Sequence, residues 1–132
     1  MSYKIKSTES EEIEVFLNEI MGVTEEIEER FLKRAAEVEK RNIVKNLNIL
    51  RAETNDPEHK HMADDVSYRI VKDRYGGKVA RIRGGRKTGT KWHLVNDGTY
   101  RSKATHFIDT AMKQSDEEIE QIFEEEMERG GF

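Results

Sequence analysis

Nine basic side chains gather within residues 69–91, where a single acidic residue, Asp73, opposes them. The segment therefore carries a charge of +8, and because the whole chain carries −4, the remaining residues carry −12. Basic side chains in such number bind polyanions through counterion release, or bind acidic protein surfaces. The sequence thus fits electrostatic binding and ordinary solvated strand and helix faces equally well. The basic residues are Arg69, Lys72, Arg74, Lys78, Arg81, Arg83, Arg86, Lys87 and Lys91.

A glycine-rich run at residues 84–91, GGRKTGTK, superficially resembles a phosphate-binding loop. The nucleotide-binding pattern requires Gly, four residues, and then Gly-Lys-Ser/Thr. Gly84 and Gly89 have this separation, but Thr90 stands where the lysine must meet the terminal phosphates. No long helix is expected directly after it. We interpret the run as a flexible basic loop that can reach DNA or a neighbouring subunit.

The histidines do not form a convincing metal or catalytic site. His59 and His61 are one residue apart, but Pro57 places them in a loop, and the chain has no cysteine to complete a thiolate site. His93 and His106 are interpreted as packing or hydrogen-bonding residues. No serine stands in a nucleophile arrangement, and the many glutamates are interpreted as solvated side chains on helices. The sequence predicts no enzyme activity, no cofactor and no metal.

Length and composition indicate one domain over residues 1–132, large enough for a core without disulfides. The first residues, MSYKIKSTESEE, lack the apolar stretch of a signal peptide, and no run reaches the length of a membrane span. We therefore expect a soluble protein that is intracellular at synthesis. Acidic residues crowd residues 9–29 and 116–128, so the molecule is expected to be dipolar and suited to head-to-tail contacts.

The first half of the chain is predicted to be mainly helical. Residues 3–6 alternate and suggest a short strand or a disordered start, and Thr8 with Glu11 fits a capping box before a short helix that Gly22 ends. Thr24 is expected to cap a longer helix with acidic residues in its first turn, running to about Leu50 or Arg51. The expected apolar positions are Ile13, Phe16, Leu17 and Ile20 in the short helix, and Ile27, Phe31, Ala35, Val38, Ile43, Leu47 and Leu50 in the long one.

The second half is predicted to form a hairpin and a closing helix. Residues 53–61 read as a loop, residues 66–71 and 79–83 alternate as two strands, and residues 75–77 form the turn between them. Residues 92–96 fit either a third strand or a short helix. Thr105 is expected to cap a last helix that continues to Gly130, with a kink or a new cap allowed at Ser115 and Asp116. Apolar positions expected on this helix are Phe107, Ile108, Ala111, Met112, Ile119, Ile122, Phe123 and Met127.

This order of elements predicts an α+β fold, with a small antiparallel sheet packed by a long N-terminal helix and a C-terminal helix. Strand alternation places Arg69, Arg81 and Arg83 on one sheet face, away from the helices. Such a face attracts DNA without reading its sequence. Tyr68, Tyr75 and Trp92 lack the spacing of a single-strand stacking platform.

Residues 92–113, WHLVNDGTYRSKATHFIDTAMK, combine an apolar stretch, a Gly98-Thr99 turn, a basic loop and the aromatic Phe107 at the start of a helix. This block resembles the C-terminal signature of the tailed-phage head–tail joining (neck) and tail-completion proteins. The preceding order of strand, charged helices, loop and glycine-containing hairpin, residues 61–83 included, is also similar to that family. The chain departs from the family pattern at Asn96 and Asp97 before the turn and at His106 before Phe107, as expected of a divergent phage or prophage member.

The resemblance implies a structural virion protein that joins head and tail, or completes the head-proximal end of the tail, by protein–protein assembly. It implies neck, connector and tail-tube proteins as partners and a hexameric ring, formed either in isolation or only on meeting the partner. It places the protein in the virion, and in the host cytoplasm during assembly, with no membrane partner. A nonspecific DNA-binding accessory protein using residues 69–91 is the alternative. The residues expected to face a partner or DNA are Arg69, Arg81, Arg83, Arg86, Lys87, Lys91, Arg101 and Lys103.

Overall fold

The protein has an α+β fold in which a four-stranded antiparallel sheet is packed by two long helices. The computed structural model of the chain describes residues 2–9, 11–18, 23–53, 62–72, 77–85, 88–100 and 103–131. The predicted fold class is confirmed. The elements are β1 (Ser2–Thr8), β2 (Glu12–Asn18), α1 (Glu25–Glu53), the 3-10 turn η1 (Ala63–Asp65), β3 (Val66–Lys72), β4 (Lys78–Gly84), the 3-10 turn η2 (Gly89–Lys91), α3 (Trp92–Asp97) and α4 (Phe107–Arg129).

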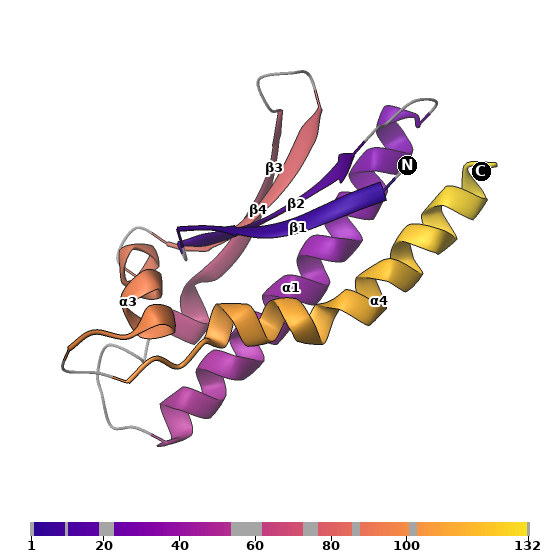
Figure 1. Ribbon diagram of the computed structural model, residues 1–132. Helices are drawn as coiled ribbons and strands as arrows, with labels where there is room; N and C mark the ends of the chain where they lie inside the picture. Colours follow the sequence, from indigo (N-terminus) through magenta and orange to yellow (C-terminus); the bar gives the residue numbers. More distant parts are fainter. Residues whose placement is uncertain are drawn as a thin grey trace.

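The sheet has the strand order β1-β2-β4-β3, so β1 and β3 form its two edges. Helix α1 packs against β2, β3 and β4 and lies beside α4, which also contacts β1 (Figure 1). The inward side chains of the strands and the apolar faces of both helices form one buried cluster. Tyr3 of β1, Phe31 of α1 and Phe123 of α4 meet in this cluster, with ring centroids 5.1–5.6 Å apart. Both helices therefore cover the same face of the sheet.

Helix α1 begins where the sequence predicts. The hydroxyl oxygen of Thr24 accepts a hydrogen bond from the N–H of Ile27 at 3.2 Å, and acidic residues fill the first turn, where they complement the helix dipole. The predicted apolar stripe faces the core, with Leu50 half-buried at its end. The helix ends at Glu53, close to the predicted end.

The predicted short helix after Thr8 is wrong, because residues 12–18 form strand β2. Ile13, Val15 and Leu17 alternate on the inner face and are buried, while Phe16 lies on the other face, where the ammonium of Lys6 is 5.6 Å from its ring centroid. Thr8 forms no capping box. Glu9 adopts a positive φ of 53°, and the N–H of Glu11 donates to the carbonyl oxygen of Thr8, which closes a tight turn between β1 and β2. Ile20 and Gly22 lie outside the described residues.

The predicted hairpin of residues 66–83 is confirmed as β3 and β4, whose register runs from Val66 opposite Gly84 to Lys72 opposite Lys78. The turn between the two strands lies outside the described residues except for Gly77. Of the loop predicted at residues 53–61, only Glu53 is described, and it is the last residue of α1. Of the two interpretations of residues 92–96, the short helix is correct, since these residues belong to α3. Trp92 is fully buried there and packs edge-to-face on Phe107, with ring centroids 5.5 Å apart.

Helix α4 starts at Phe107, but the predicted cap at Thr105 is wrong. The Thr105 hydroxyl and N–H both donate to the carbonyl oxygen of Val95, so neither serves α4. The residue before the helix, His106, has a left-handed backbone and makes no capping hydrogen bond through its side chain. No break follows at Ser115, whose hydroxyl donates to the Ala111 carbonyl oxygen while the helix continues to Arg129.

The prediction that the glutamates are simply solvated is wrong for three of them. Glu39 and Glu126 are fully buried between α1 and α4, and the side chain of Glu28 on α1 is also buried. Carboxylates are rarely buried unless they are paired or protonated. Glu126 accepts hydrogen bonds from Arg30 and Arg34 at 2.8 Å, whereas both carboxyl oxygens of Glu39 lack a partner among the described residues. Burial of Glu126 is thus compensated by pairing, whereas Glu39 has no such compensation among the described residues.

Candidate functional site

Three arginines lie on the face of the sheet that the helices leave open. Ile82, Ala80 and Tyr68 point into the core from β3 and β4, so the alternating Arg81 and Arg83 of β4, and Arg69 of β3, point to the other face. Arg69 and Arg81 stand directly opposite each other in the register, and Arg83 follows two residues along β4. We call these three residues the arginine face.

The arginine face has unused binding capacity. Like charges directly opposite each other on neighbouring strands are destabilising, and Arg69 and Arg81 are such a pair. Neither they nor Arg83 make an ion pair with any residue in the described part of the chain. The Nε of Arg81 is also buried and has no hydrogen-bond partner there. An external carboxylate or phosphate would relieve this repulsion and satisfy the guanidinium groups.

The sheet register also brings two carboxylates beside the arginines. Glu12 of β2 is opposite Arg83, and Glu14 is opposite Arg81. The Glu14 carboxylate accepts a hydrogen bond from the Thr8 hydroxyl at 2.9 Å. Burial and the negative charge of Glu14 raise the pKa of Glu12, although Arg81 and Arg83 act in the opposite direction. Our sequence interpretation missed both residues because it assigned them to a helix; the alternating Ile13, Val15 and Leu17 were the signal for a strand.

The other predicted contact residues do not join the arginine face. Lys91 lies in η2, beyond the end of β4, and Lys103 is exposed in the segment between α3 and α4. Arg86, Lys87 and Arg101 lie outside the described residues. The structure therefore brings together three of the predicted residues, all from the β3–β4 hairpin.

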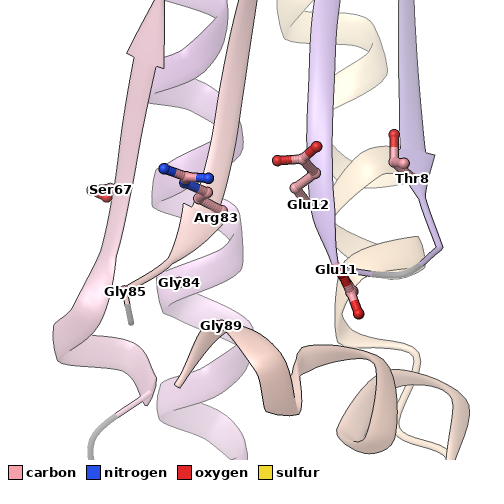
Figure 2. A pocket seen from close by; sticks show the side chains of 8 residues that line it. All are labelled: Thr8, Glu11, Glu12, Ser67, Arg83, Gly84, Gly85 and Gly89. Atoms are coloured by element: carbon pink, nitrogen blue, oxygen red, sulfur yellow. The ribbon is translucent and has the colours of Figure 1, made fainter. Parts of the chain in front are cut away.

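An open groove of about 600 Å³ lies at one end of this face. In Figure 2 the side chains of Thr8, Glu12 and Arg83 lie in a row across neighbouring strands, with Glu12 in the middle. Because the groove presents charges of both signs, it fits a mixed or zwitterionic surface better than a simple anion. Its lining residues are Thr8, Glu11, Glu12, Ser67, Arg83, Gly84, Gly85 and Gly89.

The glycines of the groove serve close packing. The N–H of Gly85 donates to the carbonyl oxygen of Asp65, and the N–H of Gly89 donates to that of Gly85. A Cβ on Gly84 would stand 2.6 Å from the Trp92 Nε1, and one on Gly85 would stand 2.3 Å from an Asp65 carboxylate oxygen. A phosphate-binding loop needs free backbone N–H groups and a lysine, whereas these two N–H groups are used internally and Asp65 adds negative charge.

Within the described residues no group of three or more His, Asp or Glu side chains could hold a metal ion, and His59 and His61 lie outside them. The His93 Nδ1 is 3.6 Å from a Glu11 carboxylate oxygen, too far for a hydrogen bond. The His106 Nδ1 is 3.0 Å from the Asp109 carboxylate on the surface. None of the described helices is long and apolar enough to cross a membrane.

A second charged surface runs along α4. Five exposed carboxylates repeat about every helical turn, and in the described residues none of them forms an ion pair. Burial raises the pKa of Tyr3 in β1, and Glu120, Asp116 and Glu124 raise it further, so the stripe runs along the β1 side of α4. On the other side of α4, Glu118 and Glu125 pair with arginines of α1. We call this surface the acidic stripe; it consists of Asp116, Glu117, Glu120, Glu124 and Glu128.

The residues 92–113 that resemble the phage family form a compact joint between α3 and α4. Asn96 is fully buried at its centre. Its side-chain oxygen accepts a hydrogen bond from the N–H of Ile108 at 2.9 Å, which caps α4 from another helix. Its side-chain NH₂ donates to the carboxylates of Asp97 and Asp109, and its backbone carbonyl oxygen accepts from the N–H of His106. Asn96 therefore fixes both ends of the segment that contains the Gly98-Thr99 turn.

Replacing Asn96 with alanine is expected to lower the free energy of unfolding by about 1–3 kcal/mol, because it removes a helix cap and leaves buried polar groups unsatisfied. Urea unfolding of the variant tests this. Asn48→Ala, at an exposed position of α1, is the matched control and should change stability by less than about 0.5 kcal/mol. Equal effects of the two substitutions would contradict the capping role.

Compared with known proteins, the chain matches no protein-family model, no curated protein and no solved structure.

Proposed function

We propose that the protein is a structural virion protein of a tailed phage or prophage, which joins head and tail or completes the head-proximal end of the tail. The observation that carries the proposal is the presence of two oppositely charged surfaces, the arginine face and the acidic stripe, without internal ion-pair partners in the described residues. Surfaces of this kind are suited to assembly with other protein surfaces. The resemblance of residues 92–113 to the neck and tail-completion family supplies the kind of assembly.

The proposed mechanism is binding without catalysis. Contact of two arginine faces, or of two acidic stripes, would bring like charges together, so contacts between copies should be head-to-tail. Such heterologous contacts close into a ring when the rotation between copies permits. A hexameric ring in the virion follows from the family resemblance. Arg86, Lys87, Lys91, Arg101 and Lys103 would add positive charge toward neck, connector or tail-tube partners.

Electron microscopy of tails from the encoding phage or induced prophage tests this function. The gold-labelled protein should bind at the head-proximal end of the tail, and particles made without it should accumulate as separate heads and tails. Label scattered along the tail or absent from it, together with normal joining in the deletion strain, would refute the proposal. Localisation to the virion, and to the host cytoplasm during assembly, is part of the same proposal.

Nonspecific DNA binding is the second candidate, and it is favoured by Arg69, Arg81 and Arg83, which form no ion pair within the described part of the chain. If it is correct, the isolated protein binds duplex DNA at low salt, with an affinity that falls steeply as salt rises. Replacing the three arginines with alanine should then abolish binding. Absence of binding at an ionic strength of about 0.01 M, where the Debye length is about 30 Å, would exclude this function.

A further inference from the structure

We infer that the arginine face binds the acidic stripe of a second copy of this chain. The inference rests on the assembly proposed above and names the two surfaces that meet in it. The acidic stripe is exposed, and so are Arg69 and Arg83, while Arg81 between them is half-buried. Both surfaces lack ion-pair partners in the described part of the chain, and they lie on different layers of the fold. One copy therefore cannot satisfy its own arginine face with its own stripe, and the complementary charges are available between copies.

The spacing of the charges on the two surfaces agrees. Along α4, Glu120 and Glu124 are four residues apart, which corresponds to about 6 Å of helix rise. Along β4, Arg81 and Arg83 are two residues apart on the same face, which corresponds to about 6.7 Å. A helix lying along β4 can thus place successive carboxylates over successive guanidinium groups. Arg69, on the neighbouring strand about 4.8 Å away, can reach the same carboxylates.

The charges around the arginine face favour a protein surface over a nucleic acid. Glu12 and Glu14 stand beside the arginines on β2, and they would repel a phosphate backbone. The exposed surface of α4 also carries charges of both signs, because Lys113 lies one turn before Asp116 and Glu117. The groove beside Arg83 likewise presents both signs. Neighbouring charges of both signs on the two surfaces favour a partner with a matching pattern over a uniform polyanion.

Sedimentation velocity on the full chain and on charge-reversed variants tests the inference. The wild-type protein should self-associate at low ionic strength, and salt should weaken the association. Arg69→Glu with Arg83→Glu should weaken it at least tenfold, and so should Glu120→Lys with Glu124→Lys. All four positions are exposed, so folding should persist, and circular dichroism checks this.

Combining the two charge-reversed double variants, in one chain or in a mixture, is the decisive experiment. A chain that carries all four substitutions should associate as the wild type does, and an equimolar mixture of the two double variants should also recover. The quadruple variant keeps the wild-type net charge of −4, so its recovery cannot be an effect of net charge. The matched control, Lys33→Glu with Lys45→Glu on the exposed side of α1, shifts the charge as the arginine double variant does and should leave association nearly unchanged.

The inference fails if the wild-type chain remains monomeric up to about 1 mM, or if the quadruple variant associates no better than the double variants. These results leave the proposed function standing if labelled protein still binds the head-proximal end of tails, since assembly would then use other surfaces. Loss of tail localisation with intact, rescuable self-association would instead reject the function and keep the interface. DNA binding that the arginine double variant abolishes, with no self-association, would assign the arginine face to DNA and also overturn the inference.

Discussion

Replacing both Arg30 and Arg34 with methionine is expected to lower the free energy of unfolding by about 2–4 kcal/mol, because the fully buried Glu126 would then lose both close partners. The three charged groups join α1 to α4 through bonds of 2.8 Å, and Arg34 also reaches Glu125. Burial alone would raise the pKa of Glu126, but the hydrogen bonds from Arg34 and Arg30 hold it below its ordinary value. The Arg129 guanidinium is 3.7 Å from Glu126 and largely exposed, so it would replace little of the stabilisation that Arg30 and Arg34 give to the Glu126 carboxylate.

Urea unfolding near neutral pH measures the effect, and a triple variant identifies its cause. Adding Glu126→Leu to the two methionine substitutions should restore most of the stability, since an apolar group at that site needs no partner. Arg41→Met, which breaks the exposed pair with Glu118, should cost no more than about 1 kcal/mol. A double variant whose stability equals that of Arg41→Met would show that Glu126 does not depend on its arginines.

The same network predicts a loss of stability in acid. The folded pKa of Glu126 lies below its unfolded value of about 4.5, so the folded state binds fewer protons than the unfolded state between the two values. The stabilisation is therefore present above the unfolded pKa and is lost as the pH falls through the folded pKa. In the double methionine variant this acid-induced loss should be largely absent.

Those elements whose signals lie within a few neighbouring residues could be predicted from the sequence. Thr24 followed by acidic residues and a long apolar stripe defines α1, and alternation about Gly77 defines the β3–β4 hairpin. The β2 segment satisfies two periods at once, since Ile13, Phe16 and Leu17 fit a helix while Ile13, Val15 and Leu17 fit a strand. Pairing with β4, far along the chain, decides between them.

The candidate site shows the same division between local and distant information. Alternation within one hairpin places Arg69, Arg81 and Arg83 on a common face, which is visible in the sequence. Their neighbours Glu12 and Glu14 become visible only through the β2–β4 register. The first turn of α4 is capped by Asn96, whose side-chain oxygen accepts a hydrogen bond from the N–H of Ile108, twelve residues further along the chain. The local sequence signal for a cap at Thr105 is therefore misleading. Likewise, the local sequence does not show which glutamates of α1 and α4 will be buried where the two helices meet.

The buried Glu39 makes stability depend on pH in the direction opposite to Glu126. Burial raises the pKa of Glu39 to about 8; Ser115 opposes this rise, and the negative charge of Asp116 reinforces it. The opposition from Ser115 is limited, because its hydroxyl already donates to the Ala111 carbonyl oxygen and accepts from Asn42. Glu39 should therefore be protonated in the folded protein at neutral pH, at the contact between α1 and α4.

Replacing Glu39 with glutamine is accordingly expected to raise the free energy of unfolding at alkaline pH by about 2–4 kcal/mol, since a pKa unit corresponds to about 1.4 kcal/mol. In the wild type the folded state keeps this proton up to about pH 8, whereas the unfolded chain releases it near 4.5. The stability that the Glu39 proton contributes is thus fully present below the unfolded pKa of about 4.5 and is lost as the pH rises to the folded pKa of about 8. Glutamine carries no titrating proton, so its variant should lose this decline.

Urea unfolding of both proteins at about pH 5, 7 and 9 measures the difference, which should be small at the lowest pH and grow toward the highest. Glu117→Gln, at an exposed position of α4, is the control and should follow the wild-type curve. Parallel curves for wild type and Glu39→Gln would mean that Glu39 is ionised in the folded protein, and that α1 and α4 hold a buried negative charge by some rearrangement of Asn42 and Ser115.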